Sequence, residues 1–210
     1  MQRGQILIVI RAASAVVVVI AIIAQAIELA NHGRFDMTRF FAFFTIQSNL
    51  IGVAAFAWLI FNRSAARSRR LELLRGAAAV YLTVTFFVVI FLLSGVDVQL
   101  QLGWVDFVLH KLFPVVVVLD WIVDPPVSSL SYRDALAWLG YPLVWTGLTL
   151  IRGAADGWYP YPFLDPAHGG YGQVALTVVA VVIGFFVVAL ATIALGNVQS
   201  RRAANLRPAT

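Results

Sequence analysis

The residues best suited to chemistry in this sequence are a threonine and a histidine that lie inside two apolar segments. Thr45 lies in the segment of about 40–61 and His110 in the segment of about 104–123. A threonine hydroxyl is a weak nucleophile until a base removes its proton, and histidine is the usual base because it titrates near neutral pH. The pair therefore predicts nucleophilic, acyl-transferring chemistry if the fold brings the two side chains together.

Three polar residues on the same segments are predicted to support this pair. Asp106 lies one helical turn before His110 on the same face, so its carboxylate can accept a hydrogen bond from the imidazole and fix its tautomer. Asn49 is a candidate donor to an oxyanion. Lys111 either stabilises charge or extends its ammonium group to the outer headgroups.

Further polar residues have a structural explanation beside the functional one. Ser48 offers a second hydroxyl one turn from Thr45, but serine, threonine and asparagine also hold membrane helices together by hydrogen bonds. Glu28 and Arg152 end two apolar segments on the same side as Thr45, and they are further candidates to support the site. An ionisable group inside a membrane is costly, which favours a functional role for His110.

The composition places these residues in a membrane. Of the 210 residues, 61% are hydrophobic and 12% are charged, whereas a soluble domain has about 45–50% and about 25%. This excludes a soluble globular enzyme, a disordered chain and a nucleic-acid-binding module. The net charge of +5 does not indicate nucleic acid, because the arginines cluster at the ends of apolar runs, where they set topology. Since cysteine is absent and the histidines are dispersed, we expect no cofactor and no metal site.

Six apolar runs predict an all-α, polytopic membrane protein that forms one domain over residues 1–210. Each run is long enough to cross a hydrocarbon core of about 30 Å. Backbone groups in lipid must be satisfied within the segment, so each run is expected to form a helix. The predicted helices cover about 5–27, 40–61, 76–94, 104–123, 135–152 and 173–195.

The distribution of arginine predicts the orientation of these helices. Arginine-rich residues 63–75 and the tail with Arg201, Arg202 and Arg207 are assigned to the inner side, which makes both termini cytoplasmic. The run 63–75 is expected to contact anionic headgroups. The outer segments are then 28–39, 95–103 and 153–172. With a rise of 1.5 Å per residue, Thr45 and His110 lie about 7–8 Å and about 9 Å below the outer surface, at one level.

The two loops before the last two helices carry distinct signals. The outer loop 153–172 is rich in proline and aromatic residues, which indicates an interfacial anchor or, alternatively, a lid over a site at the outer end. On the inner side, Ser131 and Asp134 predict a capping box that opens the fifth helix. Asp120 is expected near the inner surface, where it helps helix packing.

The segments around Thr45 and His110 resemble those of a known family. Residues 43–50 (FFTIQSNL) resemble the second-helix threonine motif of the androgen-induced multi-pass membrane proteins, and residues 110–114 (HKLFP), followed by Asp120, resemble their histidine motif. The stretch from Tyr141 to Asp165 is similar to bacterial relatives of that group. In layout, the resemblance covers most of the chain. It implies a threonine hydrolase that acts on fatty acid esters of hydroxy fatty acids, with Thr45 as the nucleophile and His110 as its partner.

The sequence thus predicts an intramembrane esterase for lipid-like esters in a bacterial plasma membrane, with membrane lipids and a lipid-like substrate as its partners. Two alternatives stay open. The first is a non-enzymatic protein that binds or transports a lipid or small solute with the same polar layer, which tight binding without turnover would indicate. The second is an assembly partner with no site, which predicts helix contacts and no cavity between the second and fourth segments.

Overall fold

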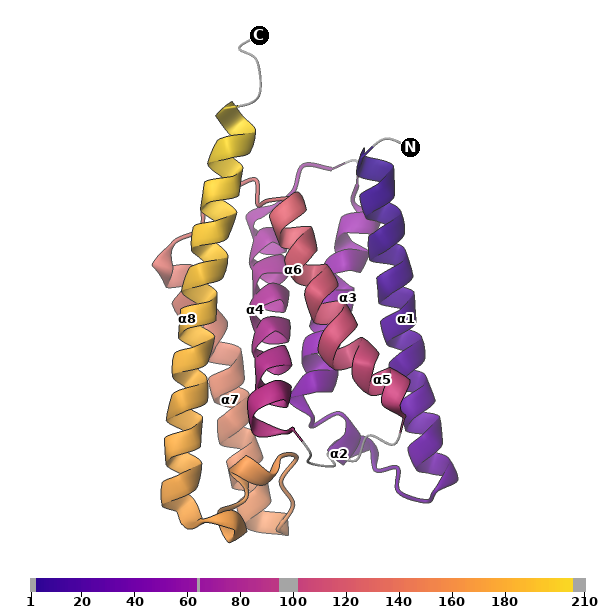
Figure 1. Ribbon diagram of the computed structural model, residues 1–210, viewed down its shortest axis with the longest axis vertical. Helices are drawn as coiled ribbons and strands as arrows, with labels where there is room; N and C mark the ends of the chain where they lie inside the picture. The colour runs from indigo at the N-terminus through magenta and orange to yellow at the C-terminus, as the bar shows by residue number, and fades with distance from the viewer. Residues whose placement is uncertain (1–2, 64, 95–101, 206–210) are drawn as a thin grey trace.

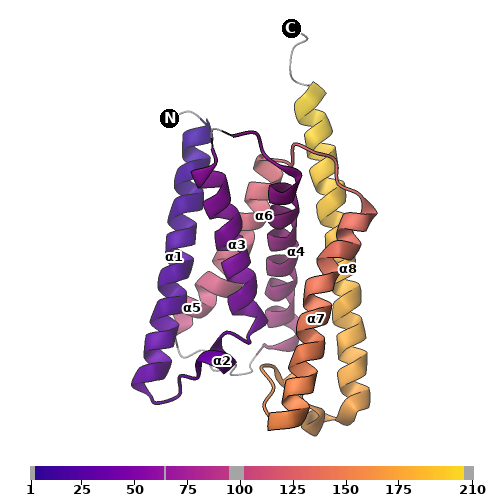
Figure 2. The same cartoon turned by 180° about the vertical axis from the view of Figure 1, so that it is seen from behind.

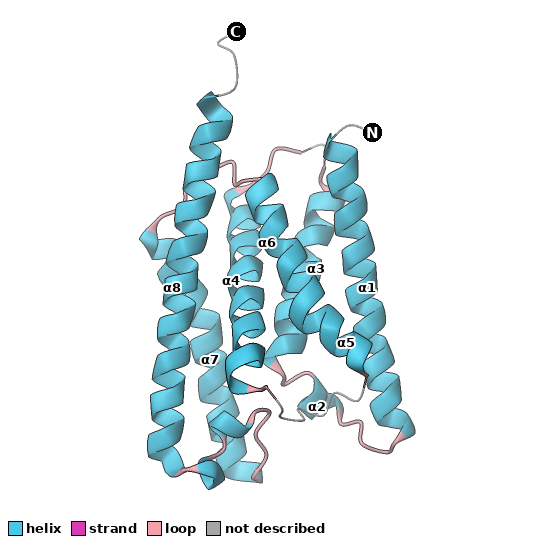
Figure 3. Ribbon diagram, viewed as in Figure 1, coloured by secondary structure: helices cyan, strands magenta, loops and turns pink. Residues whose placement is uncertain are grey.

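The chain is described by a computed structural model that covers residues 3–63, 65–94 and 102–205, with side chains described to residue 202. Within these ranges the chain forms helices and loops and no strand (Figure 3). The elements in chain order are α1 Arg3–Asn31, α2 Met37–Phe40, α3 Phe44–Phe61, α4 Arg69–Leu92, α5 Gly103–Phe107, the π-helix η1 Val108–Leu112, α6 Phe113–Val123, α7 Tyr132–Asp156, the 3₁₀ helices η2 Pro162–Leu164 and η3 Pro166–His168, and α8 Gly170–Asn205.

Each of the six predicted runs lies largely in helix, and several of the helices extend beyond the predicted bounds. Polar caps explain two of these differences. Ser68 accepts a hydrogen bond from the Leu71 N–H, so α4 begins well before the predicted residue 76. The capping box of Ser131 and Asp134 is present, as predicted, and α7 begins directly after Ser131, with Asp134 in its first turn.

The second predicted run, residues 40–61, is not one continuous helix, because the helix is interrupted before Thr45. The short helix α2 ends at Phe40, and α3 begins only at Phe44. Thr45 therefore lies in the first turn of α3. Because the first N–H groups of a helix have no partner within it, the Thr45 N–H is left available to another part of the chain.

The fourth predicted run is not one regular helix. A π-helical turn, η1, separates α5 from α6 and contains His110. Pro114 follows it, and a proline has no N–H to donate to the carbonyl four residues earlier and clashes with that carbonyl. The wider π-turn accommodates this clash, so His110 lies on an irregular segment, as residues of functional sites often do.

The helices form one bundle in which α4 is central. It packs against α3, α6 and α8, while α1 packs on α3 and α7 packs on α8 (Figures 1 and 2). One buried apolar cluster joins α1, α3, α4 and the α5–η1–α6 segment, and a second joins α4, α7 and α8. The start of α1 and the end of α8 lie at one end of the bundle, and α2, η2 and η3 lie at the other.

Four helices of the described chain are long and apolar enough to cross a membrane: α1, α3, α4 and residues Gly170–Arg202 of α8. The outer faces of α1 and α8 expose large apolar side chains, among them Ile20, Ile23, Leu176 and Ile183. Such extended apolar surfaces are typical of contact with lipid. The chain therefore has the character of a membrane protein.

Buried ion pairs join the helices at the end where α1 begins. Arg11 Nε lies 2.7 Å from Asp120, and the Arg75 guanidinium lies 2.8 Å from Glu72 and 3.0 Å from Asp120. Asp120 thus helps helix packing, as predicted. The prediction that the whole run 63–75 contacts headgroups is wrong for Arg75, which is 3% exposed and is held by these carboxylates. The predicted outer residues 95–101 and the tail residue Arg207 lie outside the described residues.

Candidate functional site

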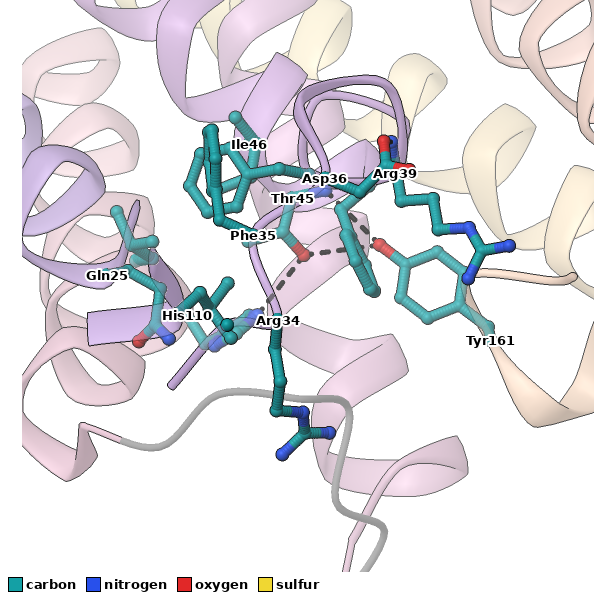
Figure 4. Close-up of a pocket in the computed structure, with 14 residues that line it drawn as sticks. Gln25, Arg34, Phe35, Asp36, Arg39, Thr45, Ile46, His110 and Tyr161 are labelled. Atoms are coloured by element: carbon teal, nitrogen blue, oxygen red, sulfur yellow. Dashed lines mark hydrogen bonds between the residues drawn. The ribbon is translucent and has the colours of Figure 1, made fainter. Parts of the chain in front are cut away.

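The predicted meeting of Thr45 and His110 is present in the structure. The Thr45 Oγ1 atom lies 3.1 Å from His110 Nε2, and both side chains are buried (Figure 4). The first turn of α3 supplies the threonine, and the π-turn of η1 supplies the histidine. The distance is that of a hydrogen bond through which the hydroxyl can pass its proton to the ring.

Asp106 completes a hydrogen-bonded series of three side chains. Its Oδ1 atom lies 2.8 Å from His110 Nδ1. A ring that donates its Nδ1–H to this carboxylate keeps Nε2 free to accept the proton of Thr45. Lys111 lies 3.7 Å from the other Asp106 oxygen, and its side chain is 48% exposed, so it contacts Asp106 and extends outward. The series of Thr45, His110 and Asp106 has the order of nucleophile, base and orienting acid.

Asn49 fastens the two halves of this arrangement together. Its amide nitrogen donates to the Thr45 carbonyl at 2.8 Å and to the Leu109 carbonyl at 3.1 Å. Because an amide nitrogen has two hydrogens and both are used, Asn49 has no donor left for an oxyanion. Asn49 therefore holds α3 against η1 and does not make the predicted contact to an oxyanion.

The other predicted residues do not join the site. Ser48 donates to the Thr45 carbonyl at 3.1 Å and lies 3.4 Å from Thr85 on α4, so its hydroxyl faces away from His110. Glu28 lies 3.4 Å from His32. Arg152 lies 3.2 Å from Asp156. Both residues are at the predicted end of the bundle. Glu28 pairs with a neighbour on its own segment, whereas Arg152 also donates to the carbonyl and hydroxyl oxygens of Thr38 on α2, at 3.2 and 2.9 Å.

A tyrosine that the sequence analysis did not single out also reaches the threonine. Tyr161 lies in the loop after α7, and its hydroxyl is 3.3 Å from Thr45 Oγ1 and accepts from the Thr45 N–H at 3.3 Å. Burial raises the pKa of this phenol, so it keeps its proton at neutral pH. The signal in the sequence was the aromatic and proline composition of residues 153–172, which left anchor and lid as alternatives. The structure places one of these aromatic residues against Thr45.

Close packing fixes the loop that carries Tyr161. The Tyr161 ring stacks on Phe163 with centroids 5.3 Å apart and meets the Phe43 ring edge-on at 5.7 Å. At the end of α7, a Cβ atom on Gly153 would lie 2.1 Å from the Tyr159 ring. A glycine is therefore required there for the loop to return over the bundle.

A cavity of about 360 Å³ opens on the Thr45–His110 pair. Its inner wall includes Gln25, Thr45 and His110, and its mouth is formed by the segment after α1, with Arg34, Asp36 and Arg39 (Figure 4). Gln25 is the second residue that the sequence analysis did not assign to the site. It was visible only as a polar residue near the end of an apolar run. The cavity argues against the alternative of an assembly partner, which predicted no cavity between the second and fourth segments.

A second, narrower crevice of about 50 Å³ lies on the side of α4, α7 and α8. Its lining is almost wholly apolar and includes Phe44, Val84, Val88, Trp145 and Phe185. Thr45 and Tyr161 line both spaces. The hydroxyl pair is thus the point at which a polar cavity and an apolar crevice meet.

The arrangement can activate the Thr45 hydroxyl to attack a carbonyl carbon. The carbonyl would carry an apolar substituent on one side and a polar substituent on the other. Among the residues that the structure describes, no cluster of three or more histidine, cysteine, aspartate or glutamate side chains could hold a metal ion. Comparisons with protein-family models, with curated proteins and with solved structures found no match to the chain.

Proposed function

We infer that this protein is an intramembrane esterase that cleaves lipid-like esters with Thr45 as its nucleophile. The observation that carries the proposal is the series of hydrogen bonds from the buried Thr45 and His110 to the partly exposed Asp106, with Thr45 and His110 in the wall of a cavity. Buried polar groups of a membrane helix are costly, and a buried hydroxyl and imidazole connected in catalytic order to a carboxylate are better explained by chemistry than by packing.

In the first step, Thr45 Oγ1 attacks the carbonyl carbon of the ester while its proton passes to His110 Nε2. The negative charge moves to the carbonyl oxygen, and Asp106 stabilises the imidazolium. When the tetrahedral intermediate collapses, the bond to the alcohol oxygen breaks, and His110 returns the proton to that oxygen. The alcohol leaves, and the acyl group remains on Thr45.

In the second step, water completes the cycle. His110 removes a proton from a water molecule, whose oxygen attacks the acyl carbon. The bond to Thr45 Oγ1 then breaks, the threonine recovers its proton from His110, and the carboxylic acid is released. The Tyr161 hydroxyl, which stays protonated, donates to the oxygen atoms that carry charge beside Thr45.

The two spaces around Thr45 support an amphiphilic substrate. The apolar crevice suits the beginning of an acyl chain, and the larger cavity with a polar mouth suits the alcohol portion. A substrate with this division would enter from the bilayer. The resemblance of the segments around Thr45 and His110 to the threonine and histidine motifs of the androgen-induced membrane hydrolases supports the same assignment.

The proposal includes a topology. All six predicted runs, with α5–η1–α6 as one of them, would cross the plasma membrane of a bacterium, with both termini cytoplasmic. The placement of arginines supports this orientation. The start of α1 and the end of α8 lie at one end of the bundle, opposite the loop that bears Tyr161, which supports placing both termini on the same side of the membrane. The site then lies near the outer surface.

The test is covalent labelling of the purified protein with a fluorophosphonate that carries an alkyl chain, followed by mass spectrometry of the adduct. We expect the label on Thr45, and we expect it to disappear in His110→Ala. Thr45→Ala should remove both the label and the hydrolysis of a p-nitrophenyl ester of decanoic acid. Ser48→Ala is the matched control, because it removes a neighbouring hydroxyl that faces α4.

The outcomes separate the alternatives. A label on Ser48 would keep the esterase and replace its nucleophile. Hydrolysis that persists unchanged in both Thr45→Ala and His110→Ala would overturn the proposal. An unlabelled, folded protein that binds lipid without turnover would instead indicate the non-enzymatic binder.

A further inference from the structure

Gln25 is a buried residue whose polar atoms have no partner in the described part of the chain. The residue is 0% exposed, and neither its amide nitrogen nor its amide oxygen makes a hydrogen bond there. It lines the cavity together with Thr45 and His110. Figure 4 shows its amide end on the side of the cavity where the His110 ring lies. Most buried amides are paired, so an unpaired one in a cavity wall points to a ligand.

The chemistry of an amide restricts what that ligand group can be. Gln25 presents two N–H donors and one oxygen acceptor, and all are unused. A hydroxyl group complements both ends because it donates and accepts. A carboxylate only accepts and would face the amide oxygen with negative charge, and a quaternary ammonium neither donates nor accepts.

Of the three charged residues at the cavity mouth, Arg34 is exposed, and Asp36 and Arg39 make contacts outside the cavity wall. Asp36 Oδ1 accepts from the Thr38 hydroxyl and from the Arg39 N–H. The Arg39 guanidinium lies 5.3 Å from the centroid of the Trp158 ring. Gln25 is therefore the uncommitted polar group deep in the cavity wall, and recognition there depends on hydrogen bonds rather than on charge.

We propose that the cavity binds a hydroxyl-bearing alcohol portion of a lipid ester, as in a monoacylglycerol, and that Gln25 recognises a free hydroxyl of that portion. Gln25 then determines specificity, while Thr45 and His110 perform the cleavage. The assignment to a substrate rests on the esterase function proposed above. The binding itself does not, because the cavity and the unpaired amide exist without turnover.

Binding is measured first, with a ligand that cannot be hydrolysed. The probe is 1-O-decylglycerol, and decyl methyl ether is the comparison without hydroxyls. We compare the wild type with Gln25→Met, which keeps the length of the side chain and removes its amide, and with Gln25→Leu as a second variant. Gln199→Met on α8 is the matched control, since it makes the same change at the opposite end of the bundle.

We expect the affinity of wild type and Gln199→Met for decylglycerol to exceed that of Gln25→Met by about tenfold or more, because a site built around a hydroxyl discriminates strongly. Decyl methyl ether should not distinguish the variants. Without ligand, Gln25→Met should unfold at an equal or higher temperature than wild type, since it removes an unpaired buried amide. A purely structural role would lower that temperature.

Turnover is measured second, with 1-decanoylglycerol and methyl decanoate. In Gln25→Met we expect kcat/KM to fall by about tenfold or more for the glycerol ester and to stay unchanged for the methyl ester. Equal affinity of wild type and Gln25→Met for decylglycerol, or an equal loss on both esters, would overturn the proposal and leave the esterase intact. Gln25-dependent binding without turnover of either ester would keep the binding site and overturn the esterase.

Discussion

The phenol oxygen of Tyr161 lies 3.3 Å from the hydroxyl oxygen of Thr45, although 116 residues separate them in the sequence. The contact joins the loop after α7 to the first turn of α3. The Thr45 N–H at the start of α3 has no partner within its own helix, and it donates to the same phenol. The loop is therefore part of the site and not only an anchor at the membrane surface.

Removal of the Tyr161 hydroxyl should slow the proposed reaction without unfolding the protein. In Tyr161→Phe we expect ester hydrolysis to fall about tenfold, which corresponds to about 1.4 kcal/mol, the scale of one net hydrogen bond. Steady-state kinetics measure the change. Tyr132→Phe is the matched control, because Tyr132 is exposed at the opposite end of α7. An unchanged rate in Tyr161→Phe would assign the phenol to packing alone.

The orienting role of Asp106 predicts a larger effect. Asp106→Asn keeps the shape of the side chain but favours the ring tautomer in which His110 Nε2 carries the proton, so the ring cannot accept the proton of Thr45. We expect the rate of fluorophosphonate labelling to fall by at least about a hundredfold. Glu28→Gln makes the same neutralising change outside the cavity and should label normally. Equal labelling of the two variants would contradict the series of three side chains.

Gly153 is predicted to control the position of the loop. In Gly153→Ala, the new Cβ would lie 2.1 Å from the Tyr159 ring, so that ring and the loop must shift. Hydrolysis should fall while helix content by circular dichroism stays unchanged. Gly147→Ala lies on the same helix with no atom within 4 Å of its Cβ. It should retain activity and stabilise α7 by up to about 1 kcal/mol.

The buried ion pairs at the other end of the bundle should govern stability and not activity. Asp120→Asn leaves Arg11 and Arg75 with one carboxylate fewer in a buried setting. We expect a destabilisation of about 3–5 kcal/mol, measured by thermal unfolding in detergent. The double variant Arg11→Met with Asp120→Leu should recover much of this loss. Arg70→Gln, on an exposed residue of the same region, should have little effect.

A further carboxylate at this end of the bundle, that of Asp124, pairs with Arg11 and predicts a loss of stability in acid. Burial alone would raise the pKa of Asp124, but the hydrogen bond from Arg11 and the charges of Arg75 and Arg67 outweigh burial and lower it. A lowered pKa in the folded state stabilises the protein above the unfolded value of about 3.9, and this contribution is lost as the pH falls through the folded value. The unfolding temperature of the wild type should therefore drop below about pH 4, and more steeply than that of Asp124→Asn. Parallel curves would contradict this assignment.

The sequence predicted the helical segments and the level of the site better than it predicted the partners of each side chain. Depth along a helix follows from the rise per residue, which is why Thr45 and His110 were correctly placed at one level. Depth does not say which way a side chain faces around the helix. Glu28 and Arg152 were assigned to the site for their level alone. In the structure Glu28 pairs with His32, and Arg152 pairs with Asp156 and Thr38.

The residues that sequence reasoning did not assign depend on contacts between distant segments. Gln25 joins the site only because α1 and η1 line the same cavity. Tyr161 joins it only because its loop folds back against Thr45. The π-turn at His110 was not predicted either, because apolar periodicity does not distinguish it from an α-turn. Pro114, one turn later, was the local signal for it.

The distribution of the site over the chain has a consequence for biosynthesis. Thr45 lies in the first quarter of the sequence, His110 near the middle, and Tyr161 in the loop before the last helix. A nascent chain that has inserted only its earlier helices therefore lacks the phenol beside its hydroxyl. The complete group of side chains forms only when translation is nearly finished, so the growing protein does not carry the assembled site while it is being inserted among lipids.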